Sequence, residues 1–295
     1  MTNGTTISPS APQDPLRGPA PDAAKIRIVG VYKVFGRNEA RAVELLRQGA
    51  DKTTVQAETG ANVGLAGVDA QIPAGRITCI MGLSGSGKST LVRHLNRLID
   101  PSAGQILVDG EDILSLGMPA LRELRRHKVS MVFQSFGLLP HINVLENVAF
   151  GLNVRGEPRR QARDTARQWL ARVGLEEYGR QYPDELSGGM RQRVGLARAL
   201  ATDAQVLLMD EAFSALDPLI RHDMQDQLLA LQQRLRKTIV FITHDIEEAL
   251  RLGQQIVLLR DGRVEQTGTP DDIRNRPANE YVARFVVRRT DPTGN

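Results

Sequence analysis

The sequence predicts an α/β fold in which a parallel sheet carries a helical insertion. In residues 76–99, a short apolar run is followed by glycines and then by an amphipathic helical pattern, the usual order in a parallel-sheet domain. From residue 205 onward, apolar runs of strand length again alternate with helical segments. Between these two parts, residues 135–185 lose the strand pattern and are mainly helical.

Composition limits the classes of protein to consider. The chain has 295 residues, of which 41% are hydrophobic and 24% charged, as is typical of a globular protein. A formal net charge of +4 is too small to indicate nucleic-acid binding by itself. The single cysteine, Cys79, excludes a disulfide framework and fits a reducing cytoplasm. No run of about 18 apolar residues occurs, so we expect any membrane role to require a partner.

A tail is expected at each end of one domain. Residues 1–24 are rich in Pro, Ala, Ser and Thr and lack the apolar core of a signal peptide, so they are predicted to be a disordered tail. The domain is expected to span residues 25–288, followed by a C-terminal tail at residues 289–295.

Before the glycine-rich segment, the pattern predicts two strands with a helical insert between them. Residues 26–34 and 62–72 alternate roughly as strands do. The insert at residues 37–60 has helical spacing, beginning with Ala42, Val43, Leu45 and Leu46 and broken near Gly49. Residues 76–81 then form an apolar run that is expected to be a short buried strand.

The later elements are predicted in the same way. Residues 105–110 and 128–133 are expected to be strands. A helical subdomain is expected at about 135–185, where Ala166, Trp169, Leu170 and Val173 share one helix face. Arginines cover the rest of this helix. They could be a solvated surface, or a surface that contacts anionic lipid or a membrane partner. After it we expect strands and helices in alternation, at residues 206–209, 220–236, 238–242, 246–252 and 255–260.

The glycine-rich loop at residues 82–89, GLSGSGKS, has the spacing of a phosphate-binding loop. A helix is expected at 88–99, with Leu91, Val92, Leu95 and Leu98 on one face. Backbone N–H groups of the loop and the helix N-terminus can cradle a phosphate. A plain strand-to-helix turn is the alternative, but strand, glycines, lysine and serine all fit the phosphate-binding context. The residues expected at the nucleotide are Gly82, Ser84, Gly85, Ser86, Gly87, Lys88, Ser89 and Thr90. Lys88 should reach the β- and γ-phosphates, and the Ser89 hydroxyl should bind Mg²⁺.

Two carboxylates, Asp210 and Glu211, follow the apolar run at 206–209. Ligands of open α/β sheets bind at the carboxyl ends of the strands. Asp210 is therefore placed to hold Mg²⁺, and Glu211 to orient or deprotonate the attacking water. Adjacent carboxylates could also simply begin a helix, but the phosphate-binding loop favours the catalytic interpretation.

A second phosphate-binding helix end is predicted at residues 187–189. Ser187 is a natural N-cap for a helix at 190–200, and Gly188 and Gly189 expose backbone N–H groups. This segment could be only a helix cap. Because the chain already has one phosphate-binding loop, we interpret it as part of a nucleotide site completed across a head-to-tail dimer.

Together, these motifs resemble those of ABC ATPases, with LSGGMRQ at 186–192 as the signature. The resemblance implies a P-loop NTPase of ABC type, with a parallel-sheet core, an antiparallel β part and a helical subdomain. It also implies that Ser187, Gly188 and Gly189 contact the γ-phosphate bound to the other subunit. Asp217, in SALD, would lie at the dimer seam, and His244 would contact the γ-phosphate.

Two further residues acquire a role from the same resemblance. Gln134 would bind near Mg²⁺ and the attacking water and would link the site to a membrane partner. Phe35 is the best match for the aromatic residue that stacks on adenine, with Tyr32 as the alternative.

A narrower resemblance points to the ATPases of glycine betaine/proline importers. It rests on the insert at 37–60, on Phe35-Gly36 and Gly64, and on residues 133–136 and 139–141. The best-known members carry two CBS domains after the ATPase, which this sequence lacks, so osmotic regulation remains open.

The resulting expectation is a peripheral ATPase on the cytoplasmic face of the inner membrane. It would bind ATP and Mg²⁺, pair with a second copy of itself, and serve two transmembrane permease subunits and, indirectly, a solute-binding protein, without nucleic acid. The solute would be glycine betaine, choline, proline betaine or a related quaternary amine. Alternatives are an importer of another polar solute such as an amino acid, a soluble ABC protein acting on nucleic acid or the ribosome, or a non-catalytic cassette.

Overall fold

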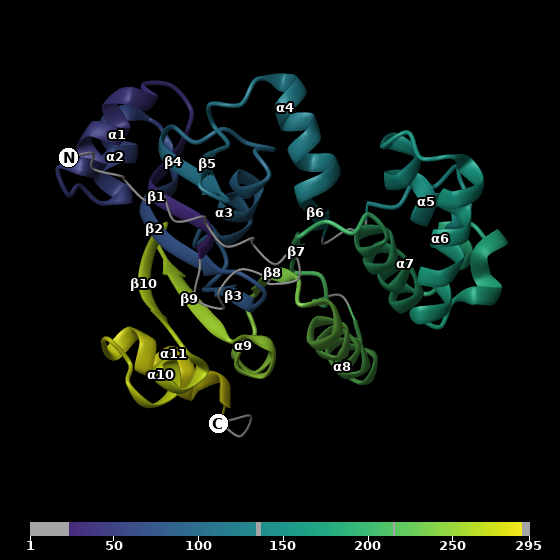
Figure 1. Ribbon diagram of the computed structural model, residues 1–295. Helices are drawn as coiled ribbons and strands as arrows, with labels where there is room; N and C mark the ends of the chain where they lie inside the picture. The colour runs from purple at the N-terminus through teal and green to yellow at the C-terminus, as the bar shows by residue number, and fades with distance from the viewer. Residues whose placement is uncertain (1–23, 134–136, 215, 291–295) are drawn as a thin grey trace, which may run out of the picture.

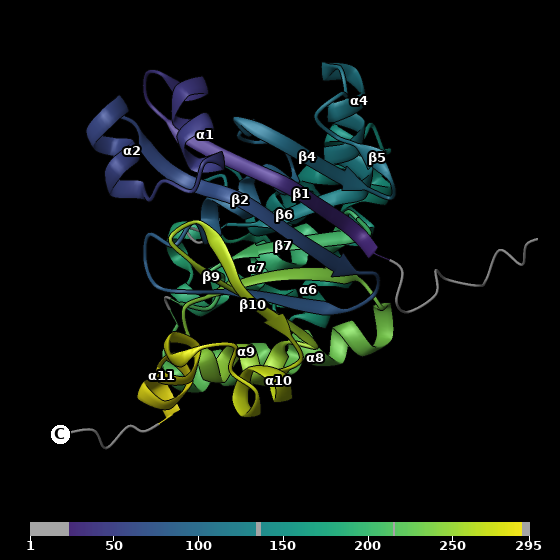
Figure 2. The same cartoon turned by 90° about the vertical axis from the view of Figure 1, so that its left-hand side faces the viewer.

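The computed structural model describes residues 24–133, 137–214 and 216–290. It contains two sheets, which lie one above the other in the view of Figure 2. The smaller sheet is antiparallel, in the order β2-β1-β4-β5, and consists of β1 (Ala24–Phe35), β2 (Asn62–Pro73), β4 (Ala103–Val108) and β5 (Glu111–Asp112). This sheet provides the antiparallel part of the predicted α/β fold.

The larger sheet has the order β10-β9-β3-β8-β7-β6. Its parallel strands are β3 (Ile77–Met81), β6 (Val129–Val132), β7 (Val206–Asp210), β8 (Thr238–Thr243) and β9 (Gln255–Arg260). Every residue of β3, β7 and β8 is buried, as expected where both faces of a parallel sheet are covered. Cys79, in the middle of β3, is completely buried. The edge strand β10 (Arg263–Gly268), which the sequence did not predict, pairs antiparallel with β9.

The insert predicted at 37–60 forms two short helices, α1 (Glu39–Arg47) and α2 (Lys52–Thr59). Asp51 caps α2 by accepting a 2.7 Å hydrogen bond from the backbone N–H of Thr54. The apolar side chains of both helices pack on β1 and β2 in a small core of their own, made of Val34, Ala42, Val43, Leu45, Leu46, Val55, Ala61 and Ala66. The insert therefore packs against the antiparallel sheet and is not part of the main core.

The helix after the glycine-rich loop is shorter than predicted. It is α3 (Lys88–Leu95), not a helix to residue 99, and Leu98 is 47% exposed instead of sharing the buried face. Arg97 adopts a left-handed backbone conformation (φ 51°), which ends the helix. Its guanidinium donates to the carbonyls of Ile113 and Leu116. After it come α4 (Met118–Glu123) and a π-helical turn (Leu124–Lys128), neither of which was predicted.

A helical layer lies to one side of the large sheet (Figure 1). It consists of α5 (Val144–Val154), α6 (Arg159–Arg172) and two 3₁₀ turns, Glu176–Arg180 and Pro183–Glu185. The predicted face of α6 is buried, whereas Arg163 and Arg167 form surface ion pairs with Glu146 and Asp164. The signature helix α7 (Gly188–Ala201) packs against α5 and α6 and then leads into β7.

The remaining helices lie on the opposite side from α1 and α2 (Figure 2). They are α8 (Pro218–Leu235), α9 (Ile246–Leu252), α10 (Pro270–Asn275) and α11 (Glu280–Thr290). The last two were not predicted. No helix within the described ranges is both long and apolar enough to cross a membrane.

Candidate nucleotide site

Three neighbouring strands bring the predicted site residues to one edge of the large sheet. Strand β8 lies between β3 and β7, and their registers pair Met81 with Thr243 and Asp210 with Ile242. The loop after β3 is the glycine-rich loop, while Glu211 follows β7 and His244 follows β8. The sheet order therefore places the phosphate-binding loop, the carboxylates and the histidine side by side.

Two glycines of the loop are required by close packing. A Cβ atom at Gly82 would lie 2.2 Å from the carbonyl oxygen of Leu259, and one at Gly87 would lie 2.6 Å from that of Gly64. Both residues also have positive φ angles, 152° and 102°, which L side chains rarely adopt. The tip of the loop, at residues 83–85, remains exposed. The backbone is thus held in a tight turn whose outer surface is open to a ligand.

Lys88 lies at the start of α3 and is 5% exposed. Its Nζ donates hydrogen bonds of 3.0 Å to the carbonyls of Gly82 and Leu83, so the ammonium lies within the curve of the loop. The neighbouring Ser86 hydroxyl is buried and has no hydrogen-bond partner among the described residues. A buried ammonium, an unsatisfied hydroxyl and a helix N-terminus form a set that fits a phosphate.

Ser89 and Asp210 meet beside this loop. The Ser89 hydroxyl donates a 2.8 Å hydrogen bond to Oδ1 of Asp210, which is 2% exposed. Arg93, one turn further along α3, places its Nη2 3.6 Å from Oδ2 of Asp210. A hydroxyl and a carboxylate suit Mg²⁺, which usually takes one or two protein ligands and completes its shell with phosphate and water. The described residues contain no cluster of three or more His, Cys, Asp or Glu that could hold a metal ion.

Glu211 and His244 form the next pair. Nδ1 of His244 lies 3.6 Å from Oε2 of Glu211. Glu211 has a left-handed backbone conformation (φ 46°), and its N–H donates to the carbonyl of Ile242 in β8. This conformation is uncommon for a residue other than glycine, although Arg97 and others in the chain share it. The side chain is half-buried, whereas that of His244 is exposed, so the pair faces the open edge of the sheet.

The signature segment lies apart from this edge. Ser187 caps α7 by accepting from the N–H of Met190 at 3.3 Å. Asp217 caps α8 by accepting from the N–H of Ile220 at 3.0 Å, and a Cβ at Gly189 would lie 2.9 Å from Cγ2 of Ile220. Helix α7 is separated from α3 in Figure 1. One chain therefore brings the signature segment beside Asp217 but not to its own phosphate-binding loop.

The two aromatic candidates occupy different environments. Phe35 is 41% exposed at the end of β1, and its ring lies against Gly64, which also faces Thr90 in the first turn of α3. Tyr32 is half-buried and packs on the α1–α2 core, with the guanidinium of Arg47 5.6 Å from its ring centroid. Phe35 is therefore the aromatic side chain that is accessible beside the phosphate-binding loop.

Comparison with known proteins agrees with this geometry. The family model described as ABC transporter matches residues 65–214, more than half of the chain. The chain belongs to the ABC transporter family. The matched region includes the phosphate-binding loop, the signature segment and both carboxylates.

Individual relatives narrow the placement within the ABC transporter family. The glycine betaine/proline betaine transport system ATP-binding protein ProV of Escherichia coli is 54% identical over 263 residues. The alignment covers 89% of this chain but 66% of ProV, so the chain spans slightly less than two thirds of that relative. The trimethylamine N-oxide transport system ATP-binding protein TmoW of Pelagibacter ubique is 47% identical over 261 residues, covering 88% of this chain and 76% of TmoW.

Solved members of the ABC transporter family share the fold. A bacterial ABC transporter cassette determined as a dimer superposes with a TM-score of 0.71 and 32% identity, covering 83% of this chain and 98% of the cassette. The same cassette in a post-hydrolysis state, bound to ADP and phosphate, gives a TM-score of 0.71 with 31% identity, covering 83% of this chain and 98% of that one. The predicted ABC-type fold is thereby confirmed.

Some residues near the site were not predicted, and one predicted residue cannot be placed. Gln134 lies outside the described residues. Arg93 was missed, although its position four residues after Ser89 on the same helix could have suggested it. Arg221 was also missed: it follows Asp217 by four residues, but its contact with Asp245 joins segments that are far apart in the sequence.

Proposed function

We propose that this chain is the ATP-hydrolysing subunit of a binding-protein-dependent ABC importer for a quaternary amine. The observation that carries the proposal is the meeting of Ser89 with Asp210, and of Glu211 with His244, at the carboxyl ends of adjacent strands. A cassette that only bound nucleotide would not need both pairs. The relatives named above are transport proteins for methylated amines or amine oxides, which supports this class of solute.

The site would bind ATP with Mg²⁺. The bound nucleotide and metal would supply the phosphoanhydride bond and the charge neutralisation that hydrolysis requires. The loop residues Gly82, Ser84, Gly85, Ser86, Gly87 and Thr90 would surround the phosphates. Lys88 would exchange its two carbonyl partners for phosphate oxygens, and Ser89 and Asp210 would hold the metal. Phe35 would stack on the adenine.

Glu211 would orient or deprotonate the attacking water. A general base must lie within hydrogen-bonding reach of the proton it accepts, and the carboxylate of Glu211 follows directly after the metal-binding position. His244, in contact with Glu211, would hold that carboxylate and contact the γ-phosphate. We retain Gln134 as the proposed sensor of the metal and the water.

Two copies of the chain would complete each other's sites. Ser187, Gly188 and Gly189 lie at the N-terminus of a 14-residue helix, α7, which is separated from α3, the helix that follows the phosphate-binding loop of the same chain. A second chain in head-to-tail orientation would receive this helix end at its γ-phosphate. Asp217, which is exposed beside the signature segment, would lie at the seam. The solved dimer of a related cassette supports this arrangement.

A cavity of about 360 Å³ offers a docking site for a membrane subunit. Phe150 and Val154 of α5 are 42% and 45% exposed in it, and Gly151 and Thr202 also line it. Arg122, Arg125 and Arg126 form the basic side. An apolar floor with a basic rim fits an amphipathic cytoplasmic helix of a permease subunit. Two such subunits would hold the ATPase dimer on the cytoplasmic face of the inner membrane, and a solute-binding protein would act through them.

The experiment that tests the proposal is reconstitution of the complete transporter in vesicles. ATP hydrolysis should increase when the binding protein is loaded with glycine betaine, choline or another trimethylammonium compound. Stimulation by amino acids alone would favour the second candidate, an importer of another polar solute. If neither the purified chain nor the assembled complex hydrolyses ATP, the ATPase assignment itself is contradicted.

A further inference from the structure

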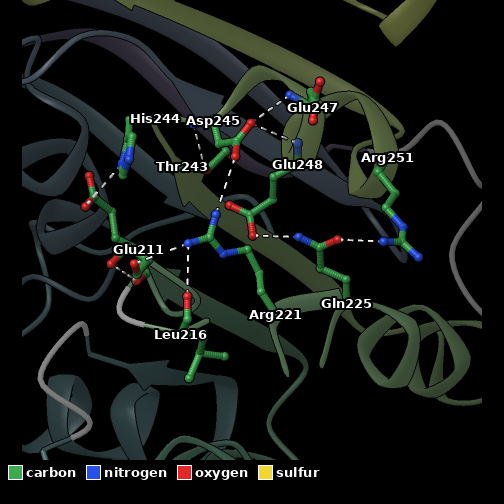
Figure 3. Close-up of polar contacts among 11 residues, drawn as sticks. Glu211, Leu216, Arg221, Gln225, Thr243, His244, Asp245, Glu247, Glu248 and Arg251 are labelled. Carbon is green, nitrogen blue, oxygen red and sulfur yellow. Dashed lines mark hydrogen bonds and ion pairs between the residues drawn. The ribbon is translucent and has the colours of Figure 1, made fainter. Parts of the chain in front are cut away.

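Five polar residues form a closed ring of contacts that includes the candidate catalytic pair, and Figure 3 labels four of them, Glu211, Arg221, His244 and Asp245. Both the N–H and the hydroxyl of Ser214 donate to the carbonyl of Glu211, at 3.1 and 2.9 Å. Arg221 contacts the carbonyl of Ser214 at 3.5 Å and, through Nη1, lies 3.6 Å from Oδ2 of Asp245. His244, the residue before Asp245, returns to Glu211. We call this set the polar ring; its members are Glu211, Ser214, Arg221, His244 and Asp245.

Arg221 is the residue that joins the two halves of the polar ring. It belongs to the first turns of α8, and besides Ser214 its Nη2 donates a 3.1 Å hydrogen bond to the carbonyl of Leu216. Its Nε is buried and has no hydrogen-bond partner among the described residues. The guanidinium therefore uses its two terminal nitrogens, one for the segment after Glu211 and one for the turn after His244. A planar guanidinium can bridge two such acceptors, whereas a single ammonium cannot do so with the same geometry.

A buried contact joins α8 to α9 close to Arg221. One turn further along α8, Gln225 donates a 3.0 Å hydrogen bond to Oε1 of Glu248, which lies in α9 and is 7% exposed. Helices α8 and α9 are thereby joined beneath the polar ring. A second link between these helices is made by Arg251, which lies 2.7 Å from Asp226 near the surface and also donates a 2.9 Å hydrogen bond to Oε1 of Gln225. Among the described residues, no bond joins Arg251 to any of the five ring members.

We propose that Arg221 is a positioning residue for ATP hydrolysis. It holds the carbonyls of Ser214 and Leu216 against the His244–Asp245 turn, so that a change at Asp217, on the dimer seam, is transmitted to Glu211 and His244. This inference rests on the proposed ATPase function. Because a catalytic group displaced by about 1 Å can lose up to roughly 10²-fold in rate, loosening the polar ring should affect turnover much more than folding.

Four variants test the proposal, and a fifth, Arg221→Lys, tests whether a positive charge alone is sufficient. Arg221→Gln removes the positive charge and the planar guanidinium with its two terminal nitrogens. Asp245→Asn removes the charge on the other side of the contact but keeps the N-cap of α9, because an asparagine oxygen can still accept from the N–H groups of Glu247 and Glu248. The double variant asks whether the two residues act together. Arg251→Gln is the matched control, since it removes one arginine between the same two helices outside the polar ring.

We expect Arg221→Gln and Asp245→Asn each to lower kcat roughly tenfold, with the ATP concentration for half-maximal rate changed by less than about twofold. The double variant should lose no more than the worse single variant, because both changes break one contact. Arg251→Gln should stay within about twofold of the unmodified protein. Arg221→Lys should recover only part of the rate. Melting temperatures should be similar throughout, because the Arg221–Asp245 ion pair is partly exposed.

Several outcomes would overturn the proposal. Arg221→Gln with an unchanged kcat would do so, as would multiplicative losses in the double variant or an equal loss in Arg251→Gln. If Arg221→Gln does not fold, Arg221→Lys and Asp245→Asn decide the question by the same criteria. An unmodified protein without any ATPase activity would refute the proposed function, whereas an active protein that is insensitive to these changes refutes only the role of Arg221.

Discussion

Ser89 and Asp210 are separated by 121 positions in the sequence, yet the Ser89 hydroxyl donates a 2.8 Å hydrogen bond to the Asp210 carboxylate. The contact exists because β3 and β7 flank β8, so the helix after β3 begins beside the end of β7. With Asp210 2% exposed, this carboxylate is already removed from water before any ligand binds. The two oxygen-bearing side chains are thus held together in the arrangement that the proposed metal site requires.

Ser89→Ala should weaken the response of the ATPase to Mg²⁺. The change removes one proposed metal ligand and leaves the buried Asp210 carboxylate without its hydroxyl donor. We expect the Mg²⁺ concentration for half-maximal activity to rise by about tenfold, the equivalent of roughly 1.4 kcal/mol. Ser115→Ala, at an exposed serine outside the site, is the control. An unchanged Mg²⁺ dependence in Ser89→Ala would remove this residue from the metal site.

Glu211→Gln should separate ATP binding from hydrolysis. Glutamine keeps the size and polarity of the side chain but cannot act as a base, so hydrolysis should slow by roughly 10²–10⁴-fold while ATP binding is retained. Single-turnover hydrolysis and equilibrium binding of a fluorescent ATP analogue would measure the two effects. Glu247→Gln, on the exposed first turn of α9, provides the matched control. Near-normal turnover in Glu211→Gln would show that another group activates the water.

Gly188→Asp should prevent the ATP-dependent dimer. A Cβ at Gly188 meets nothing within 4 Å in the single chain, so the substitution should leave the monomer intact. Its carboxylate would nevertheless face the partner's phosphates across the seam and repel them. The Glu211→Gln variant should form a dimer with ATP and Mg²⁺, as measured by light scattering. Adding Gly188→Asp to this variant should abolish the dimer, whereas adding Gly188→Ala should leave most of it. The same monomer mass with and without ATP in the parent variant would contradict the dimer model.

Burial of Glu248 should make stability depend on pH. Desolvation raises the pKa of this carboxyl above its ordinary value of 4.5, although hydrogen bonds from Thr243 and Gln225 oppose the shift. Between pH 4.5 and the raised pKa the folded protein holds a proton that the unfolded chain has lost, so stability falls as pH rises through that interval. At higher pH the cost of the buried charge applies in full.

Glu248→Gln should remove this pH-dependent cost. We expect the difference in melting temperature, variant minus unmodified protein, to be more positive at pH 8 than at pH 4.5, by about 2 °C or more. Glu247→Gln, next to it and exposed, should show no such trend. A difference that is constant across this pH range would mean that Glu248 titrates as in the unfolded chain.

Phe150→Asp should uncouple transport from hydrolysis. The change places a charge on the apolar floor of the proposed permease site, while α5 lies away from the nucleotide edge of the sheet. Solute uptake in reconstituted vesicles should fall at least tenfold, and the basal ATPase of the purified chain should stay within about twofold. Val29→Asp, at an exposed apolar residue of the antiparallel sheet, controls for loss of surface hydrophobicity. Normal uptake in Phe150→Asp would place the membrane contact elsewhere.

The sequence was most informative where a local pattern determines a local structure. The strands that carry Cys79, Met209 and Ile242 were predicted because they are continuous apolar runs. The end of α3 was wrong, because the left-handed turn at Arg97 is stabilised by carbonyls of residues 113 and 116 that periodicity does not reveal. Strand β10 is polar and lies at the edge of the sheet, so it lacks the apolar signal of a strand.

For the candidate site, residue spacing predicted the members but not all of their contacts. The phosphate-binding loop and the carboxylate pair follow from motifs with known spacing, and the structure adds that Lys88 lies within the loop. Only packing shows that Phe35 and Tyr32 occupy different environments, because in the sequence both are aromatic residues near the end of one strand. Arg221 required the folded chain, since its partner Asp245 lies beyond the whole of α8 and β8.

The complete burial of Cys79 has a practical consequence for measuring these effects. Burial raises the pKa of its thiol, so the reactive thiolate is suppressed in the folded protein. It is also the only cysteine of the chain. A cysteine introduced at the surface should therefore react alone with a spin label or fluorophore, so that distances across a dimer can be measured without first removing a native thiol. Conversely, labelling of Cys79 in the unmodified protein would require the strand β3 to open. The rate of labelling would therefore measure how fast this part of the protein unfolds.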